Sequence, residues 1–173
     1  MASFVSIIRH ALTDVIVRGE RRGGVEVITQ IVVGRGARMI VEANGVPPLS
    51  TRSDVARLLR DYLDGSIIDF SSIPIDPGEV TPFRSKVLLA ARRIPYGEVY
   101  SYTKLAAMAG VPKAVRAVGS IMRGNPLPII IPCHRVIRSD GSPGAYCGDR
   151  SGEDATLKKA LLQMERSALK MRR

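Results

Sequence analysis

The sequence has few of the residues on which disulfide-stabilised folds and metal centres depend. Two cysteines, Cys133 and Cys147, and two histidines occur among its 173 residues. Two cysteines cannot build a disulfide framework, and with only two histidines a structural zinc site is hard to assemble. The chain also lacks a secretory signal and any apolar run near the roughly 20 residues of a membrane span. We therefore expect a protein of the reducing cytoplasm that holds no metal and no cofactor.

Acidic residues are also scarce, and they are unevenly placed. Lys and Arg number 26 against 16 Asp and Glu, a formal net charge of +10. Residues 1–80 carry nine basic and ten acidic side chains, whereas residues 81–173 carry 17 basic and six acidic ones. A solvated, Arg-rich surface would account for the excess, but positive charge gathered in one part of the chain favours a nucleic-acid partner.

The first part of the chain has the pattern of strands followed by a helix. Three segments rich in Val and Ile, separated by turns at 18–24 and 34–36, predict an antiparallel meander over residues 4–17, 25–33 and 37–41. A helix is expected over 50–64, capped by Ser50 or Thr51. Its buried face would carry Val55, Leu58, Leu59 and Tyr62, and a short strand would follow over 66–70.

Pro74, Pro77 and Gly78 then interrupt every periodic pattern. The interruption coincides with the change in charge. We therefore expect an N-terminal domain (1–74), a linker (75–80) and a C-terminal domain (81–173).

The C-terminal domain is predicted to be mostly helical. Thr81 caps a helix that has Pro82 at its first position. Two short helices, over 103–109 and 113–122, flank a Gly-containing turn, which is the helix-turn-helix pattern. The second of them carries basic and small side chains that would let it lie close to DNA. A last helix is expected over 154–169.

Cys133 is the first candidate for chemistry. A free cysteine is most often a small buried apolar residue. Here His134 follows directly, with Pro132 before and Arg135 after, and cationic surroundings favour the nucleophilic thiolate. Neighbouring side chains on a strand point to opposite faces, so either the backbone turns here or a water bridges the two groups.

Two further residues admit a local and a functional interpretation. Asn125, between Gly124 and Pro126, either stabilises its own turn or braces the segment that contains Cys133. Glu165 either forms a surface ion pair with the basic residues around it or orients an imidazole.

Three strings of residues resemble one known family. Residues 113–119 (KAVRAVG), 122–126 (MRGNP) and 131–136 (IPCHRV) resemble the methylated-DNA–protein-cysteine methyltransferases, also called O6-alkylguanine-DNA alkyltransferases. The resemblance covers residues 81–169. It implies an α/β (α+β) fold, in which a small N-terminal mixed-sheet domain of ribonuclease-H-like form precedes a mostly helical DNA-binding domain with a helix-turn-helix.

The same resemblance implies a function. It predicts a monomeric DNA repair protein, associated with the nucleoid in a prokaryote, that docks in the minor groove of double-stranded DNA and flips out O6-alkylguanine. The alkyl group would pass irreversibly, in a single turnover and without a cofactor, to the protein's own cysteine.

The family's roles carry over residue by residue. Cys133 resembles the acceptor, and His134 resembles the base that activates it through a bridging water. Glu165 resembles the carboxylate that orients this histidine, Asn125 the hinge of the active-site turn, and Tyr102 the proton donor to guanine N3. The expected DNA contacts are the arginine finger Arg116 and, beside it, Lys113, Ala117, Gly119, Arg123 and Arg135. The expected substrate pocket comprises Pro128, Val136, Gly144, Tyr146, Cys147 and Lys158.

The sequence departs from the family in two places. Cys147 stands where a serine is common, and the chain between Gly148 and Leu157 is longer and more acidic than the family pattern. The main alternative function is a non-catalytic protein that binds alkylguanine and signals the lesion; a thiol hydrolase using Cys133 and His134 is another. The transfer reaction itself requires an accessible sulfur at position 133.

Overall fold

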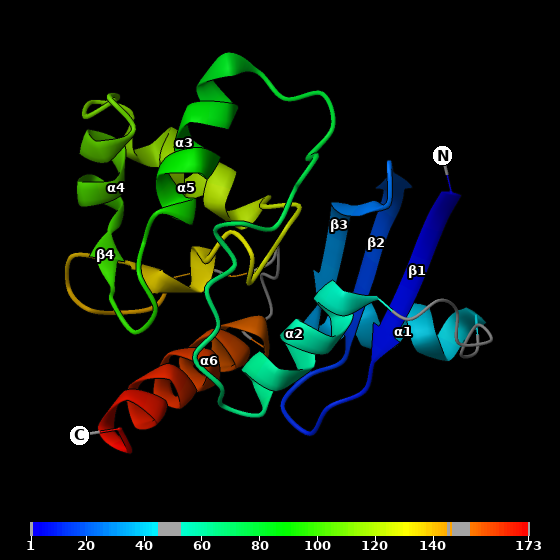
Figure 1. Ribbon diagram of the computed structural model, residues 1–173. Helices are drawn as coiled ribbons and strands as arrows, with labels where there is room; N and C mark the ends of the chain where they lie inside the picture. The colour runs from blue at the N-terminus through cyan, green and yellow to red at the C-terminus, as the bar shows by residue number, and fades with distance from the viewer. Residues whose placement is uncertain (1, 45–52, 145, 147–152, 173) are drawn as a thin grey trace.

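The structure, a computed structural model, describes residues 2–44, 53–144, 146 and 153–172 (Figure 1). Its N-terminal part is a three-stranded antiparallel sheet in the order β1 (Ala2–Ile8), β2 (Val15–Arg22) and β3 (Val25–Val33). Gly23 and Gly24, both with positive φ, form the two-residue turn between β2 and β3. An antiparallel meander of three strands is therefore present as predicted, although two of its three predicted segments differ.

The predicted strand boundaries need correction. Residues 4–17 do not form one strand, because the chain reverses over 9–14 and pairs Ile8 with Val15. The predicted turn at 18–24 is also too long, since residues 18–22 continue β2. Gly19 causes an irregularity inside β2 rather than a turn: a Cβ there would lie 2.6 Å from the Val27 carbonyl oxygen and 2.7 Å from the Phe4 ring.

The predicted strand at 37–41 is wrong. These residues lie in helix α1 (Gly34–Asn44), which starts at Gly34 with a φ of 65°. Ala37 and Ile40, three residues apart, both face Ile16 and Val32 of the sheet, as the helical period requires. The β propensity of the apolar residues in this segment was thus overridden by packing on the sheet.

Helix α2 (Asp54–Leu63) confirms the helix predicted over 50–64, with a start at the N-cap Ser53. The Ser53 hydroxyl accepts a hydrogen bond from Ala56 N at 3.1 Å and donates one to Glu26 at 2.8 Å. The predicted caps Ser50 and Thr51 lie outside the described residues. Buried on its inner face are Val55, Leu59, Tyr62 and Leu63, whereas Leu58 is half-buried.

The strand predicted at 66–70 is absent, because these residues are irregular and make no ladder. The chain instead meets the sheet a few residues later. Ile28 exchanges backbone hydrogen bonds with Pro74 and Asp76, at 3.0 and 2.9 Å, around a single parallel bridge to Ile75.

The C-terminal part confirms the predicted order of helices. Helix α3 (Pro82–Arg92) begins at the N-cap Thr81, and α4 (Tyr102–Met108) begins at Ser101, whose hydroxyl caps Lys104 N. Helix α5 (Val115–Arg123) starts two residues later than predicted, and α4 and α5 contact each other and α3 in the helix-turn-helix. The short strands β4 (Tyr100–Ser101) and β5 (Val136–Ile137) pair in parallel, and α6 (Glu153–Lys170) ends the described fold.

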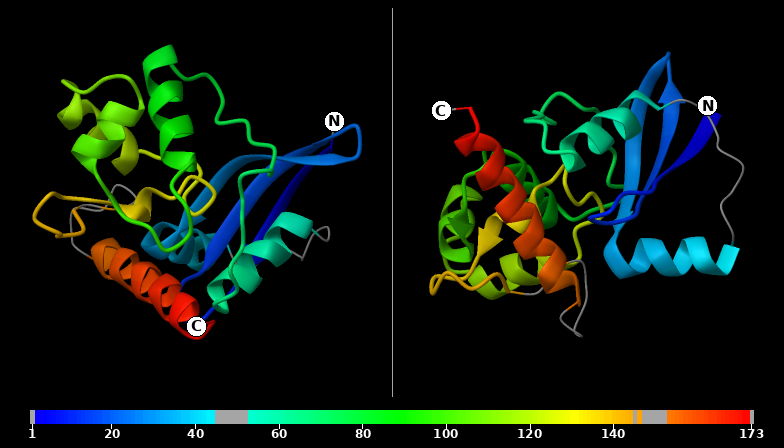
Figure 2. Two further views of the ribbon diagram at one scale, coloured as in Figure 1. Left: turned by 60° about the vertical axis from the view of Figure 1, so that its left-hand side comes forward. Right: turned by 90° about the horizontal axis from the view of Figure 1, so that it is seen from below.

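The sheet and the helices share one core. The sheet lies on one side of the molecule and α3–α5 on the other, with α2 and α6 between them (Figures 1 and 2). A single apolar cluster includes Phe4 and Ile28 of the sheet, Leu59 of α2, Val87 of α3 and Leu161 of α6. The domain boundary at 75–80 stays a prediction, with an apolar core that runs across it. None of the helices in the described ranges is long and apolar enough to cross a membrane.

Candidate active site

One buried asparagine holds the turn that carries Cys133. Asn125 follows the end of α5, and its Oδ1 accepts a hydrogen bond from Leu127 N at 3.0 Å. Its Nδ2 donates to the Ile131 carbonyl at 2.8 Å and to Cys133 Sγ at 3.1 Å. The same amide thus ties both arms of the turn together and orients the sulfur.

The backbone of this turn is tight. Cys133 N donates to the Ile131 carbonyl at 2.8 Å across Pro132, whose φ of −79° and ψ of 64° are those of an inverse γ-turn. A single 3-10 turn, Cys133–Arg135, follows, so the backbone does turn here, which was one of the two alternatives left open by the sequence. Ile129 has a φ of 74°, which is rare for a β-branched residue and costs about 1–3 kcal/mol. The turn is therefore held by its surroundings rather than by local preference.

Glu165 of α6 is fully buried and brings distant segments together. Its Oε1 lies 2.9 Å from His134 Nε2 and accepts a hydrogen bond from the Tyr62 hydroxyl at 2.7 Å. Arg135 donates to both carboxylate oxygens, at 2.8 to 3.1 Å, and Gly97 N donates to Oε2 at 3.0 Å. Of the two interpretations of Glu165, the structure thus favours the residue that orients an imidazole.

Charges fix the protonation of this cluster. Burial acts to raise the pKa of Glu165, but the hydrogen bonds and charges of His134 and Arg135 outweigh it and hold that pKa at about 2. Burial lowers the pKa of His134, despite the opposing effect of Glu165. A neutral imidazole beside a carboxylate carries its hydrogen on Nε2. His134 Nδ1 then keeps a lone pair, and it is buried with no hydrogen-bond partner among the described residues.

Cys133 itself is buried, with 2% of its surface exposed. The expectation of an accessible sulfur is therefore wrong for this conformation, because the braced turn folds the side chain inward beside the buried residues 129–131. Burial raises the pKa of the thiol, while the Asn125 hydrogen bond and the charge of Lys158 act to lower it. Among the described residues no hydrogen bond joins the His134 imidazole to the sulfur, and because the pKa of the thiol is raised, the neutral thiol is the resting form.

The predicted pocket residues lie around Tyr102 and the turn. Lys158 of α6 is fully buried and donates from Nζ to the Val136 carbonyl at 2.6 Å. A Cβ on Gly144 would lie 3.1 Å from the Tyr102 hydroxyl, so the two groups are neighbours. Burial raises the pKa of Tyr102, which keeps its hydroxyl protonated. Pro128 and Tyr146 are buried as well, and Cys147 lies outside the described residues.

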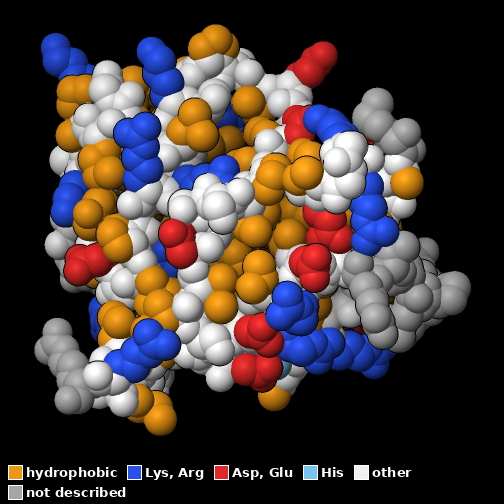
Figure 3. All heavy atoms as spheres, viewed as in Figure 1, with side chains coloured by type: hydrophobic (Ala, Val, Ile, Leu, Met, Phe, Trp, Pro, Cys, Tyr) orange, Lys and Arg blue, Asp and Glu red, His pale blue; other side chains and the backbone are white. Residues whose placement is uncertain are grey.

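The predicted DNA-contacting side chains divide into two groups. The first group is exposed on α5 or just before it and comprises Lys113, Arg116, Ala117 and Arg123. Gly119 of the same helix faces the Tyr102 ring. Lys and Arg side chains are spread over the α3–α5 part of the surface (Figure 3). The DNA contact predicted for Arg135 needs correction. Only 6% of this residue is exposed, and its guanidinium donates to Glu165 and to the Ile94 carbonyl. The structure thus gives Arg135 an internal ion pair instead of a DNA contact.

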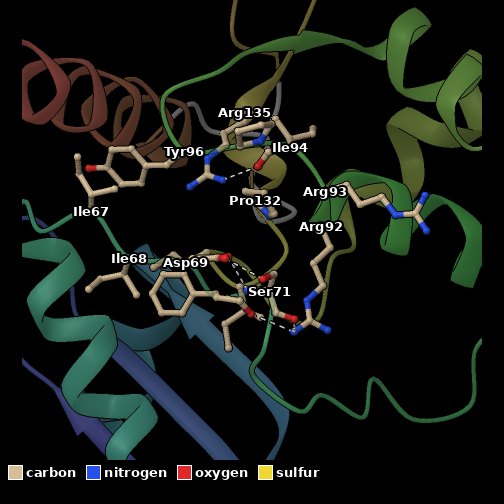
Figure 4. A pocket seen from close by; sticks show the side chains of 14 residues that line it. Ile67, Ile68, Asp69, Ser71, Arg92, Arg93, Ile94, Tyr96, Pro132 and Arg135 are labelled. Atoms are coloured by element: carbon tan, nitrogen blue, oxygen red, sulfur yellow. Dashed lines mark hydrogen bonds between the residues drawn. The ribbon is translucent and has the colours of Figure 1, made fainter.

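A cavity of about 330 Å³ lies behind the active-site turn (Figure 4). Pro132, Ile129 and Ile130 form part of its wall, and Tyr96 and Arg135 line it from another side. Arg92 closes one edge by donating to the backbone carbonyls of Phe70, Ser71 and Ile73. The back of the turn therefore faces open space rather than a solid core.

Sequence reasoning missed one member of the cluster. The helical pattern puts Tyr62 on a buried face and indicates no partner for it, whereas its hydroxyl donates to Glu165 Oε1 and lies 3.2 Å from His134 Nε2. The usable signal was its predicted burial, because a buried tyrosine hydroxyl usually finds a hydrogen-bond partner. In the described ranges, no group of three or more His, Cys, Asp or Glu residues is placed to hold a metal ion.

Comparison with known proteins points in one direction. The family model described as "6-O-methylguanine DNA methyltransferase, DNA binding domain" matches residues 82–167. The constitutive methylated-DNA–protein-cysteine methyltransferase of Bacillus subtilis is 42% identical over 118 residues, which are 68% of each chain.

Solved structures extend the similarity to nearly the whole chain. The crystal structure of the Mycobacterium tuberculosis O6-methylguanine methyltransferase superposes with a TM-score of 0.77 at 29% identity, covering 96% of this chain and 94% of that one. The Mycobacterium tuberculosis OGT in complex with DNA superposes with a TM-score of 0.70 at 28% identity, covering 95% and 93%.

Proposed function

The chain belongs to the methylated-DNA–protein-cysteine methyltransferase family, and on that basis we propose that Cys133 is the residue that accepts the alkyl group. The protein is a DNA repair enzyme that moves an alkyl group from O6-alkylguanine in DNA irreversibly to its own cysteine. The observation that carries the assignment is the position of the sulfur. Asn125 Nδ2 lies 3.1 Å from Cys133 Sγ and donates to it. The residue after Cys133 is His134, whose Nε2 is held by Glu165.

The protein's own residues supply the base. A buried thiol with a raised pKa is mostly protonated at neutral pH, so it needs a group that takes its proton during the reaction. His134 Nδ1 carries a lone pair because Nε2–H faces Glu165, and Nδ1 is the remaining nitrogen of the ring. We assign the proton transfer from Cys133 to this nitrogen, through one bridging water.

The transfer is a displacement at carbon. Cys133 Sγ forms a bond to the alkyl carbon while the bond from that carbon to guanine O6 breaks, and the electron pair of the broken bond goes to guanine. Tyr102, kept protonated by burial, gives a proton to guanine N3, which makes guanine a better leaving group. The proton held by His134 returns to Tyr102 through solvent, which leaves neutral guanine and a stable thioether. Nothing regenerates the thiol, so each molecule acts once.

The alkylated base reaches the sulfur by leaving its duplex. A base inside a helix is out of reach of a buried thiol, so the nucleotide is flipped out and the groups that cover Cys133 move. The exposed face of α5 docks in the minor groove, where the poor discrimination between sequences suits repair at any site. Arg116 fills the place of the flipped base, and the Val136 carbonyl, which has a second lone pair beside its bond to Lys158, accepts from the guanine amino group.

Two finer assignments complete the proposal. The protein acts as a monomer, and its place is the cytoplasm, at the nucleoid if the cell is prokaryotic. The basic surface of its C-terminal part, with a net charge of about +11, supports attraction to DNA of any sequence.

A transfer assay with matched cysteine variants tests the acceptor. A duplex carrying O6-[14C-methyl]guanine is incubated with wild type, Cys133→Ala and Cys147→Ala, and label on the precipitated protein is counted. We expect label on wild type and Cys147→Ala and none on Cys133→Ala, which still binds the lesion. Label on Cys133→Ala would overturn the assignment, and binding by wild type without any label would favour a non-catalytic lesion-binding protein.

A further inference from the structure

We propose that Tyr62 of α2 is a positioning residue for alkyl transfer, which holds the His134 imidazole in the tautomer that leaves Nδ1 free to act as a base. The proposal rests on the assigned roles of Cys133, His134 and Glu165. It also gives the N-terminal part of the chain a share in the chemistry, since Tyr62 lies before the predicted linker while the other members of the cluster lie after it.

The hydroxyl of Tyr62 has one hydrogen and two neighbours that compete for it. Glu165 Oε1 lies 2.7 Å away and His134 Nε2 lies 3.2 Å away. Because the Glu165 carboxylate is ionised, the shorter contact takes the hydrogen. The lone pairs of the hydroxyl oxygen are then left for His134.

His134 Nε2 consequently faces two acceptors. One is Glu165 Oε1 at 2.9 Å, and the other is the Tyr62 oxygen at 3.2 Å. An Nε2 without hydrogen would direct its lone pair at both of them in a site where Tyr62, His134 and Glu165 are all fully buried. The arrangement therefore favours hydrogen on Nε2 and places the lone pair on Nδ1.

The ring of Tyr62 is fixed by its neighbours independently of its hydroxyl. Phe70 and Tyr96 pack against it edge-on, with ring centroids 5.6 and 6.0 Å away. Replacement by Phe therefore removes only the polar contacts and keeps the packing. Arg135 also keeps its ion pair with Glu165 in that variant.

Tyr96 offers a matched control for the removal of a hydroxyl. Its ring belongs to the same aromatic group, and its buried hydroxyl has no hydrogen-bond partner among the described residues. Tyr96→Phe removes a hydroxyl from the neighbouring ring and, within the described part of the chain, breaks no hydrogen bond to Glu165 or His134. Both variants are compared with wild type for thermal unfolding, affinity for lesion DNA and single-turnover transfer.

We expect Tyr62→Phe to transfer roughly tenfold more slowly than Tyr96→Phe, since a hydrogen bond to a charged group is lost from the reacting arrangement. Lesion affinity should be unchanged. A spectroscopic signature separates positioning from stability: the chain has only two histidines, so the 15N spectrum of its imidazoles resolves the tautomer of His134. Wild type and Tyr96→Phe should show the Nε2–H form alone. In Tyr62→Phe the Glu165 carboxylate stays as an acceptor at Nε2 but the Tyr62 oxygen is gone, so a measurable share of the Nδ1–H form should appear beside the Nε2–H form.

Three results would overturn the proposal. Transfer by Tyr62→Phe at the rate of Tyr96→Phe is the first, and slower transfer with an unchanged His134 tautomer is the second. The third is an Nδ1–H tautomer of His134 in wild type, which decides the matter even if Tyr62→Phe does not fold. The proposed function is tested separately, by the labelled-duplex assay. If Cys133 takes no label in wild type, the acceptor assignment is wrong. The role of Tyr62 is still tested in that case, because the tautomer of His134 is measured without any transfer.

Discussion

At the scale of single residues, the Glu165 carboxylate organises the site. It receives hydrogen bonds from Tyr62, from the adjacent residues His134 and Arg135, and from the backbone of Gly97, which belong to three separate segments of the chain. An anion buried in this way is stable only with such partners. Its removal should therefore affect both the fold and the orientation of the imidazole.

Glu165 makes stability depend on pH in the acid range. Its folded pKa of about 2 lies below the ordinary 4.5, so its contribution is fully present above pH 4.5 and is lost as the pH falls toward 2. A shift of this size corresponds to about 3 kcal/mol. Urea unfolding over this range should show the loss in wild type and in Glu98→Gln, a variant of an exposed glutamate. Glu165→Gln should lack that part of the slope, and an equal slope in all three proteins would contradict the assigned pKa.

The thiol of Cys133 should react slowly with small reagents. Burial raises its pKa above the ordinary 9.0, so alkylation by iodoacetamide should still accelerate as the pH passes 9.0. The rate is measured by mass spectrometry in a Cys147→Ser background, with the urea-unfolded protein as control. Lys158→Met removes a neighbouring positive charge and should move the profile further upward. A rate that levels off below pH 8 would show that the thiol is activated without its substrate.

The residues of the site were unequally predictable. Cys133, His134 and Asn125 lie within short strings, so their resemblance to a family could be seen in the sequence. Tyr62 and the inward direction of Arg135 could not, because each depends on a contact with α6, which is 30 to 103 residues away along the chain. Contacts of that kind are set by tertiary packing and leave no local pattern.

At the scale of elements, the turn between α5 and the 3-10 turn is held by side-chain bonds. Asn125→Ala would leave Leu127 N without its partner in a buried site, which costs about 1–3 kcal/mol. The Ile131 carbonyl, in contrast, would keep its hydrogen bond from Cys133 N. We expect a loss of about 2 kcal/mol in the free energy of unfolding, together with slower transfer. Urea unfolding and the labelled-duplex assay measure the two effects. A variant as stable and as active as wild type would show that the turn does not depend on this amide.

Helix α5 should matter for duplex DNA and little for the chemistry. Arg116 is exposed, so Arg116→Ala should leave thermal unfolding unchanged. Repair of an O6-methylguanine duplex should fall about tenfold, because the gap left by the flipped base costs a few kcal/mol when it is not filled. Reaction with the free O6-methylguanine base should change less than about twofold. Arg166→Ala, an exposed change of the same charge on α6, is the control, and equal losses on both substrates would count against Arg116 as the finger.

Local sequence signals predicted some elements well, but not the segments that depend on packing. Thr81 with Pro82 marks the start of α3, and a segment rich in Val and Ile marks β3. The segment 37–41, in contrast, is rich enough in apolar residues to suit a strand, and its helical state is decided by contact with the sheet. The parallel pair β4 and β5 joins residues 36 positions apart, which no local pattern indicates.

At the scale of the whole molecule, positive charge and the apolar core are distributed differently along the chain. The excess positive charge is confined to residues 81–173, whereas the apolar core continues from the sheet through α2 to α6. Charge thus separates the part that matches the DNA-binding domain model from the part before it, while packing joins them. The bond from Tyr62 to Glu165 lies where these two parts meet.

Single turnover at one sulfur is the central claim, and mass spectrometry of the wild-type protein tests it most directly. The protein is incubated with an excess of O6-methylguanine duplex, its intact mass is followed over time, and the product is digested and sequenced. We predict a gain of one CH2 unit per chain that then stops, located on the peptide that contains Cys133. An unmodified Cys133, a gain on the peptide that contains Cys147, or continued release of guanine beyond one equivalent would contradict the account.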